Sequence, residues 1–315
     1  MTGKPDQLLI RAADSAGVAV AAARLRAGAL VAVPTETVYG LAARADSADA
    51  VAAIYRAKGR PDFNPLIVHV PDLDAAGALA EVGEAARLLA RHFWPGALTL
   101  VLPLKEGARI APAVTAGLPT IALRCPAHPV MREVLEAAGL PLAAPSANRS
   151  GEVSPTRAEH VAASLGAAAG LVLDGGACAA GIESTIVALR ADGWQVLRPG
   201  PVTEAQISAL LGPPLDAKTE GRIEAPGQLA SHYAPGKPVR LNAAAAAADE
   251  FLIGFGPVAG ETSLSPSGDL AEAAARLYDA LHRAAAAPQP RIAVAPIPAE
   301  GIGAAINDRL QRAAV

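Results

Sequence analysis

Polar side chains that could bind an anion stand where short apolar runs of the sequence end. Hydroxyl, amide, imidazole and guanidinium groups recur in this position: Thr35, Arg60, Asn64, His69, Thr120, Arg124, Ser146, Asn148, Ser184 and Arg198. Such groups suit a polyanion or a carboxylate, and they stabilise developing charge by position rather than by covalent chemistry. They do not suit a general acid–base mechanism built on paired carboxylates.

Lys58 and Arg60 flank Gly59 at the expected end of a helix that Ser47 can cap. Two cations, a glycine and Asn64 just before the next apolar run could form a cradle for an anion. The same spacing also fits an ordinary helix end, where Lys58 complements the helix dipole and Arg60 is solvated.

The other candidates also have purely structural interpretations. His69 lies in an apolar run and could be a core histidine. Ser146 and Asn148 could be ordinary turn residues. Arg124 and Arg198 could form surface ion pairs. Spacing alone does not decide between these roles.

Several catalytic and metal-binding motifs are missing from the sequence. The six histidines are scattered, and none stands at metal-ligand spacing from another histidine or a cysteine. There is no GxSxG elbow, no P-loop and no HExxH. Two cysteines, Cys125 and Cys178, are too few for a disulfide framework, which fits a reducing compartment.

The elements that must position these residues alternate between short apolar strands and helices, which predicts an α/β fold with ligands beyond the strand ends. Strands are expected at 30–33, 66–70, 98–102, 120–123, 142–144 and 171–173, with a hairpin of 184–189 and 194–197. Helices are expected at 14–27, 47–59, 79–93 and 130–138, from Ser154 to about 165, and from a Thr203/Gln206 capping box.

Composition divides the chain into three parts. Residues 1–211 form the predicted first domain, and 212–238 form a linker with five prolines and four glycines. The linker contains SHYAP, and a spacer has no need of a His-Tyr pair. Residues 239–315 repeat the strand and helix alternation and form a smaller predicted α/β domain.

Length and charge bound the kind of protein. The chain has 315 residues, 52% of them hydrophobic and 18% charged, with a net charge of −3. It can fill two domains and has no basic arm that demands nucleic acid. The N-terminus lacks a signal-peptide core, and charges interrupt the alanine runs. We therefore expect a cytoplasmic protein with no membrane partner.

Five stretches in order resemble the YrdC/Sua5 family of threonylcarbamoyl-AMP synthases. They are PTETVYGL, KGRP with NPLIVHV, FWPGALTLVLP, APSANRSGEVSPT and GIESTIV, between about residues 15 and 205. The SHYAPGKP linker and the extra C-terminal part resemble the longer Sua5-type members. The resemblance implies a YrdC-like twisted open sheet with flanking helices, and a smaller Rossmann-like C-terminal domain.

The resemblance also implies an activity. L-threonine, bicarbonate and ATP would give L-threonylcarbamoyl-AMP and pyrophosphate, with Mg²⁺ carried mainly by the ATP phosphates and no dedicated metal site. The product would pass to a tRNA threonylcarbamoyl-transferase complex, for N6-threonylcarbamoyladenosine at tRNA position 37.

Residue roles follow from the matching motifs. Lys58 and Arg60 would be catalytic. The implied ATP-binding residues are Arg60, Asn64, Thr120, Ser146, Asn148, Ser154, Arg198 and, as a lid, Tyr233. The implied threonine-binding residues are Thr35, His69, Arg124, Ala144 and Ser184. Arg124 suits the threonine carboxylate as a bidentate partner. Glu36 and Glu183 are interpreted as structural carboxylates.

Two other functions remain open at this point. A YrdC-like domain could be a module that binds double-stranded RNA or tRNA without turnover, although the net charge of −3 argues against this as the main role. Weak RNA binding by the enzyme is compatible with the sequence. The third alternative is a carbamoyl-transfer domain of the hydrogenase-maturation type, but the chain lacks the zinc-finger cysteines expected for it.

Overall fold

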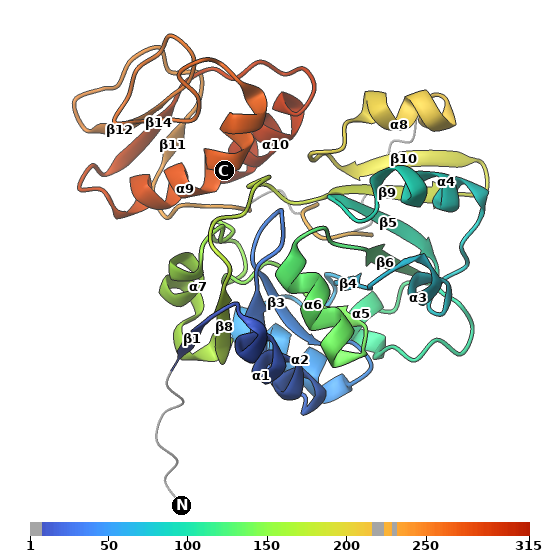
Figure 1. Ribbon diagram of the computed structural model, residues 1–315. Coiled ribbons are helices and arrows are strands. Elements are labelled where there is room, and N and C mark those ends of the chain that lie inside the picture. The colour runs from blue at the N-terminus through green and yellow to red at the C-terminus, as the bar shows by residue number, and fades with distance from the viewer. Residues whose placement is uncertain (1–7, 216–223, 229–231) are drawn as a thin grey trace, which may run out of the picture.

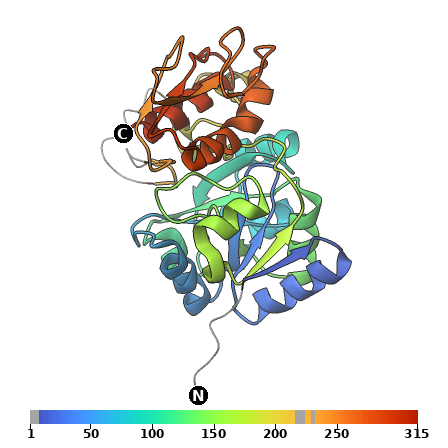
Figure 2. The same ribbon diagram turned by 90° about the vertical axis from the view of Figure 1, so that its left-hand side faces the viewer.

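The computed structural model describes residues 8–215, 224–228 and 232–315 and contains two sheets (Figure 1). The large sheet has ten strands in the order β1-β8-β2-β3-β7-β4-β6-β5-β9-β10. The small sheet is parallel, in the order β11-β14-β12-β13. We call residues 239–315, which form the small sheet and its helices, the C-terminal unit. In Figure 2 it sits on top of the larger domain.

The elements have the following bounds. The strands are β1 (Leu9–Ala12), β2 (Val31–Val33), β3 (Gly40–Arg44), β4 (Ile67–His69), β5 (Leu98–Pro103), β6 (Thr120–Arg124), β7 (Leu142–Ala143), β8 (Leu171–Asp174), β9 (Thr185–Arg190), β10 (Gly193–Arg198), β11 (Val239–Arg240), β12 (Glu250–Gly254), β13 (Thr262–Ser263) and β14 (Arg291–Val294). The α-helices are α1 (Ser15–Arg26), α2 (Ala48–Lys58), α3 (Leu73–Gly77), α4 (Glu84–Phe93), α5 (Pro112–Thr115), α6 (Pro129–Ala138), α7 (Ala158–Leu165), α8 (Glu204–Leu211), α9 (Leu270–Ala286) and α10 (Gly303–Ala313), and a 3₁₀ helix spans Gly166–Ala169.

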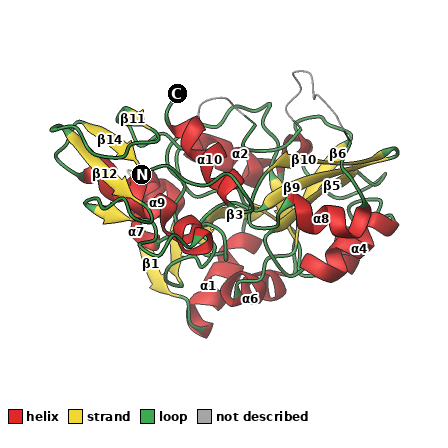
Figure 3. Ribbon diagram, turned by 90° about the horizontal axis from the view of Figure 1, so that it is seen from above, coloured by secondary structure: helices red, strands yellow, loops and turns green. Residues whose placement is uncertain are grey.

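Side-chain alternation gives the large sheet one apolar face and one partly polar face. In β6, Ile121 and Leu123 enter the main core, while Thr120, Ala122 and Arg124 share the opposite face. The main core is covered by α2, α4, α7 and α8, and Figure 3 shows α4 and α8 together beside β9 and β10. Polar site residues can therefore occupy one face without disturbing the core.

The partly polar face is covered in two different ways. Helices α1 and α6 lie side by side (Figure 1) and pack on β2, β7 and β8 through a separate apolar cluster that includes Leu25 and Met131. Farther along, over β4, β5, β6 and β9, the cover includes the linker residue Ala225. The functional residues lie on this second half of the face.

Capping explains most helix boundaries. The Ser47 side chain accepts from the Ala50 amide at the start of α2, and Gly59 ends α2 with φ 59°. Asp14 caps α1, and the Thr203/Gln206 capping box starts α8. These predictions and the predicted β9/β10 hairpin are confirmed.

Two predicted helix starts are wrong, and β3 was not foreseen. The helix expected from residue 79 begins at Glu84, because Ala80 forms a bridge with Leu104. The helix expected from Ser154 begins at Ala158, because the Ser154 hydroxyl donates to Glu183 instead of capping.

None of the helices in the described ranges has the length and apolar character needed to cross a membrane.

Leu100→Ala should destabilise the large domain. Leu100 is fully buried in β5, between β6 and β9. The truncation leaves a cavity and should lower the free energy of unfolding by about 2–5 kcal/mol in urea titration. Leu9→Ala on edge strand β1, where Leu9 is 40% exposed, is the matched control and should change it by less than about 0.5 kcal/mol. Equal losses for both variants would contradict this packing.

Candidate functional site

One cavity on the partly polar face brings together residues from several strands and the linker. Eight predicted site residues line it: Arg60, His69, Arg124, Ala144, Ser146, Ser184, Arg198 and Tyr233. They come from positions 60 to 233, so only the fold makes them neighbours.

Lys58 stands behind this cavity and holds the loop after β7. Its ammonium group is buried and donates to the carbonyl oxygens of Ser146, at 2.6 Å, and Asn148. The Asn148 side chain donates to the carbonyls of Arg149 and Glu152. Burial, together with the charge of Arg60, lowers the pKa of Lys58 well below its usual value. Lys58 thus shapes the Ser146 loop, with no carboxylate partner within salt-bridge distance in the described part of the chain.

Arg60 holds the chain before β4. Its guanidinium donates to the carbonyls of Asn64 at 3.2 Å and Pro65 at 2.9 Å. Burial lowers the pKa of Arg60 to about 10. Asn64 contacts Arg60 through its backbone carbonyl, and Thr120 begins β6, where it pairs with Pro103 of β5. Neither Asn64 nor Thr120 lines the cavity.

Arg198 is the third buried cation of the site. It donates to the Ser184 carbonyl at 2.9 Å and to the Pro226 carbonyl at 3.4 Å. Its Nη2 also reaches the Ser184 hydroxyl at 3.3 Å, and that hydroxyl lies 2.7 Å from Thr99 Oγ1. Burial lowers the pKa of Arg198. Arg198 thus joins β9 to the linker.

Lys58, Arg60 and Arg198 share one electrostatic property. Each is buried, and each contacts carbonyl oxygens but, within the described residues, no carboxylate at salt-bridge distance. Burying unpaired cations is costly, because backbone carbonyls supply only partial negative charge. The arrangement favours a ligand that carries several negative charges.

Arg124 stands in a different setting. Its Nη2 lies 2.7 Å from Glu36 Oε1, and its Nη1 donates to Thr37 Oγ1 at 2.9 Å. Burial opposes ionisation of Glu36, but Arg124 still lowers the pKa of that carboxyl group. Thr35 does not line the cavity, because its hydroxyl donates to the Val38 carbonyl and accepts the Thr37 amide. Thr35 therefore shapes the turn that carries Glu36 and Thr37.

His69 lies beside Arg124 in the strand register and is 2% exposed. Its Nδ1 has no hydrogen-bond partner among the residues that the structure describes, and the ring lines the cavity. Burial, with the charge of Arg124, lowers the pKa of His69 to about 3. A neutral imidazole with an unused nitrogen can accept or donate one hydrogen bond to a ligand.

Ser154 does not reach the cavity. Its hydroxyl donates to Glu183 Oε1 at 2.6 Å, and Glu183 does line the cavity. Ser154 therefore acts on the site through Glu183 in this structure.

Tyr233 fills part of the site. It is 1% exposed, its hydroxyl has no hydrogen-bond partner within the described ranges, and its backbone has φ 64°, which is rare for a residue other than glycine. Strained backbone of this kind is found preferentially at ligand clamps and switch regions. The cavity is only about 50 Å³, far below the roughly 300–1,000 Å³ of pockets that hold drug-sized ligands. In this conformation the cavity is therefore too small for a nucleotide.

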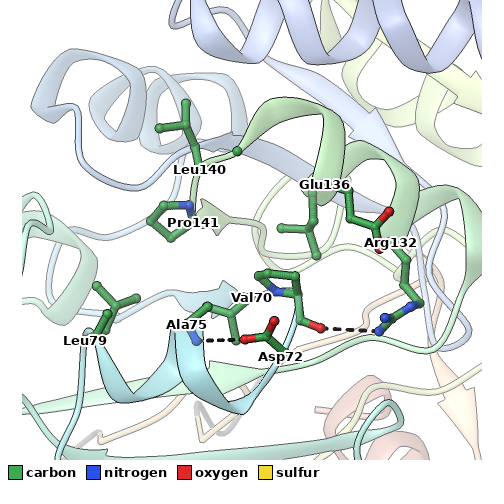
Figure 4. Close-up of a pocket in the computed structure, with 12 residues that line it drawn as sticks. Val70, Asp72, Ala75, Leu79, Arg132, Glu136, Leu140 and Pro141 are labelled. Atoms are coloured by element: carbon green, nitrogen blue, oxygen red, sulfur yellow. Dashed lines mark hydrogen bonds between the residues drawn. The ribbon is translucent and has the colours of Figure 1, made fainter.

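A second, larger pocket lies elsewhere. It measures about 500 Å³ and lies between α3 and α6 (Figure 4). Its lining includes Leu79, Leu140 and Pro141, and its hydrogen bonds join Arg132 to Pro71 and Ala75 to Asp72. None of the predicted site residues lines it, and it has no comparable set of buried cations.

In the described parts of the chain, no cluster of three or more His, Cys, Asp or Glu side chains could hold a metal ion.

Comparison with known proteins gives the family. A family model described as "Telomere recombination", covering Sua5, YciO and YrdC, matches residues 23–200. A second, described as "Threonylcarbamoyl-AMP synthase, C-terminal domain", matches residues 202–315. The chain belongs to the Sua5/YrdC family. The family predicted from the sequence and the two-part α/β architecture are confirmed.

Relatives extend this result over nearly the whole chain. A Bacillus subtilis protein named threonylcarbamoyl-AMP synthase is 42% identical, over 94% of this chain and 92% of its own length. The crystal structure of Pyrococcus abyssi Sua5 complexed with L-threonine matches with a TM-score of 0.88 and 34% identity, over 98% of this chain and 97% of that one. The names of these relatives agree with the predicted synthase and not with a module that only binds RNA. A HypF structure, at 21% identity and a TM-score of 0.53, shows only a shared fold.

Sequence reasoning missed several cavity residues of this Sua5-type chain. Thr37, Glu183, His232 and the linker residues Pro226 and Gly227 line the cavity but were not placed in the site. The His-Tyr pair was the available signal for the linker. Glu183 lies inside the GIESTIV stretch, but nothing local shows that its carboxylate faces the cavity.

His69→Gln should weaken the pH dependence of stability. Between pH 6.5 and about 3 the unfolded chain binds a proton at His69 that the native state excludes, so stability is lost as pH falls through this window. From pH 7 to pH 5, wild type should lose about 2 kcal/mol more than the variant in urea unfolding. Equal losses would show that His69 is not buried in its neutral form.

Proposed function

We propose that this chain makes L-threonylcarbamoyl-AMP and pyrophosphate from L-threonine, bicarbonate and ATP. The observation that carries the proposal is a set of three buried cations that have no carboxylate at salt-bridge distance among the described residues: Arg60 and Arg198 line one cavity together with Arg124, and Lys58 holds the Ser146 loop of that cavity. The names of the relatives and the threonine complex of Pyrococcus abyssi Sua5 support it.

The triphosphate belongs beside Arg60 and Arg198. Both guanidiniums line the cavity and donate to backbone carbonyls, and Arg198 also donates to a serine hydroxyl, so phosphate oxygens can replace these weaker partners. Lys58 would act from behind, by fixing the Ser146 loop and by stabilising negative charge that develops on the phosphates. Asn64, Thr120 and Asn148 would support this side.

Threonine belongs beside Arg124 and His69. Its carboxylate would share the Arg124 guanidinium with Glu36 or displace it, and its amino group or carbamate would meet the unused nitrogen of His69. Ser184 and the backbone of Ala144 would complete this side. The threonine amine and bicarbonate would form a carbamate with loss of one water molecule. An oxygen of that carbamate would then attack the α-phosphate, and pyrophosphate would leave.

Mg²⁺ would enter as part of the ATP substrate. Glu183, a carboxylate of the cavity lining, already accepts three hydrogen bonds, which fits a metal carried mainly by phosphate oxygens.

The linker would protect the product. Threonylcarbamoyl-AMP is a mixed anhydride that water can hydrolyse, and Tyr233 would move from its present place to cover the nucleotide. We assign residues 212–238 to this linker, between a first domain of residues 1–211 and the C-terminal unit.

We place the protein in the cytoplasm, where it would pass the product to a tRNA threonylcarbamoyl-transferase complex. No observation on this chain favours tRNA or double-stranded RNA binding.

A pyrophosphate-release assay with mass analysis of the product tests the proposal. Release should require threonine, bicarbonate and ATP together, and Lys58→Ala and Arg60→Ala should each lower kcat/KM by about 100-fold or more with the fold retained. Lys105→Ala is the matched control and should leave kcat/KM unchanged. Exposed Lys105 also donates to a backbone carbonyl, that of Gly77 at 3.2 Å, but it does not line the cavity.

Release without threonine or bicarbonate would refute the proposed reaction. Unchanged turnover in both Lys58→Ala and Arg60→Ala would refute the phosphate role of these residues.

A further inference from the structure

Glu183 is shared between the two parts of the molecule. Its Oε1 accepts from Ser154 of the large domain at 2.6 Å. Its Oε2 accepts from Tyr278 at 2.8 Å and from Arg309 Nε at 2.9 Å, both in the C-terminal unit. Burial opposes its ionisation, but Arg309, assisted by Arg198, holds the pKa of Glu183 at about 2. The cavity carboxylate is thus held ionised mainly by a residue 126 positions later in the chain.

Arg309 is fully buried on α10, and each of its three guanidinium nitrogens donates a hydrogen bond. Besides Glu183, it donates to Asp308 Oδ2 at 2.6 Å and to the Pro199 carbonyl at 3.0 Å. Pro199 follows Arg198 directly. Arg309 therefore contacts the chain at one cavity residue, Glu183, and next to another, Arg198. Arginine side chains are seldom fully buried unless they are paired, so the burial of Arg309 points to a structural role for these contacts.

Tyr233 is packed by the same residues. Its ring stacks on Tyr278 with 5.5 Å between centroids, and the Arg309 guanidinium lies 5.3 Å from its centroid. The His232 amide, next to it, donates to the carbonyl of Arg312 on α10. The C-terminal unit therefore contacts both the carboxylate and the aromatic ring of the cavity.

The loop that carries Glu183 also lies directly on α9. A Cβ at Gly181 would stand 2.4 Å from the Ala275 carbonyl oxygen, and Gly181 has φ 68°. This close backbone contact places the loop independently of the charged pair.

We propose that Arg309 and Tyr278 are positioning residues for the nucleotide side of the site: they fix Glu183, and through it Ser154, and they set where Tyr233 rests. This inference rests on the proposed function, because it assigns the C-terminal unit a part in forming the ATP site. If Arg309 and Tyr278 only hold the large domain and the C-terminal unit together, their substitution would lower the stability of the protein. It would then change the affinities for ATP and for threonine equally.

Steady-state kinetics of the full-length protein tests this proposal. Tyr278→Phe keeps the ring stack and removes one donor to Glu183, and Glu183→Gln removes the charge. Each should raise KM for ATP about tenfold, the order expected for loss of a buried hydrogen bond to a charged group, and change KM for threonine less than about twofold. Arg291→Met is the matched control, because Arg291 forms an exposed ion pair with Asp249 in the same unit and should leave both constants unchanged.

Arg309→Met adds a pH readout. Without Arg309, burial should raise the pKa of Glu183, so kcat/KM for ATP should fall as pH is lowered from 8 to 6, more steeply than in wild type. Adding Glu183→Gln to Arg309→Met should remove this extra slope. If Arg309→Met does not fold, Tyr278→Phe and Glu183→Gln carry the test.

The inference would be overturned if Tyr278→Phe and Glu183→Gln fold and keep the wild-type KM for ATP. It would also be overturned if KM changed equally for ATP and for threonine. If wild type itself makes no threonylcarbamoyl-AMP, the proposed function fails instead, so the two failures are distinguishable.

Discussion

Three buried cations, none with a carboxylate at salt-bridge distance in the part of the chain that the structure describes, are the feature on which the rest of the site depends. Lys58, Arg60 and Arg198 come from α2, the chain after it and β10, and each is held by backbone carbonyl oxygens. Burial lowers the pKa of all three groups, because it disfavours their charged forms. A fold that retains such an arrangement gains from an anion that neutralises it, and this is what a nucleotide triphosphate supplies.

The two sides of the cavity differ in charge balance. On the side where we propose that threonine binds, Glu36 already neutralises Arg124, which would suit an amino acid that brings one carboxylate and one amino group. On the side where we propose that the phosphates bind, the lining carboxylate Glu183 accepts hydrogen bonds from Ser154, Tyr278 and Arg309. In the proposed mechanism the C-terminal unit would thus keep Glu183 occupied and leave Arg60 and Arg198 to the substrate.

Much of the site could be predicted because strand ends and period-two alternation are local properties. His69 and Arg124 end neighbouring parallel strands, so their proximity follows from the strand assignments. Other roles could not be predicted. Ser154 looks like a helix cap, yet its hydroxyl meets Glu183, 29 residues away. The contact of Glu183 with Arg309 depends on how the C-terminal unit packs, and no local pattern encodes that.

A crystal structure of the protein with a non-hydrolysable ATP analogue and L-threonine tests the central claim most directly. The account predicts phosphate oxygens on the guanidiniums of Arg60 and Arg198, with Tyr233 displaced from the cavity and the threonine carboxylate on Arg124. Phosphates bound at another surface, with Arg60 and Arg198 still on their backbone carbonyls, would contradict it.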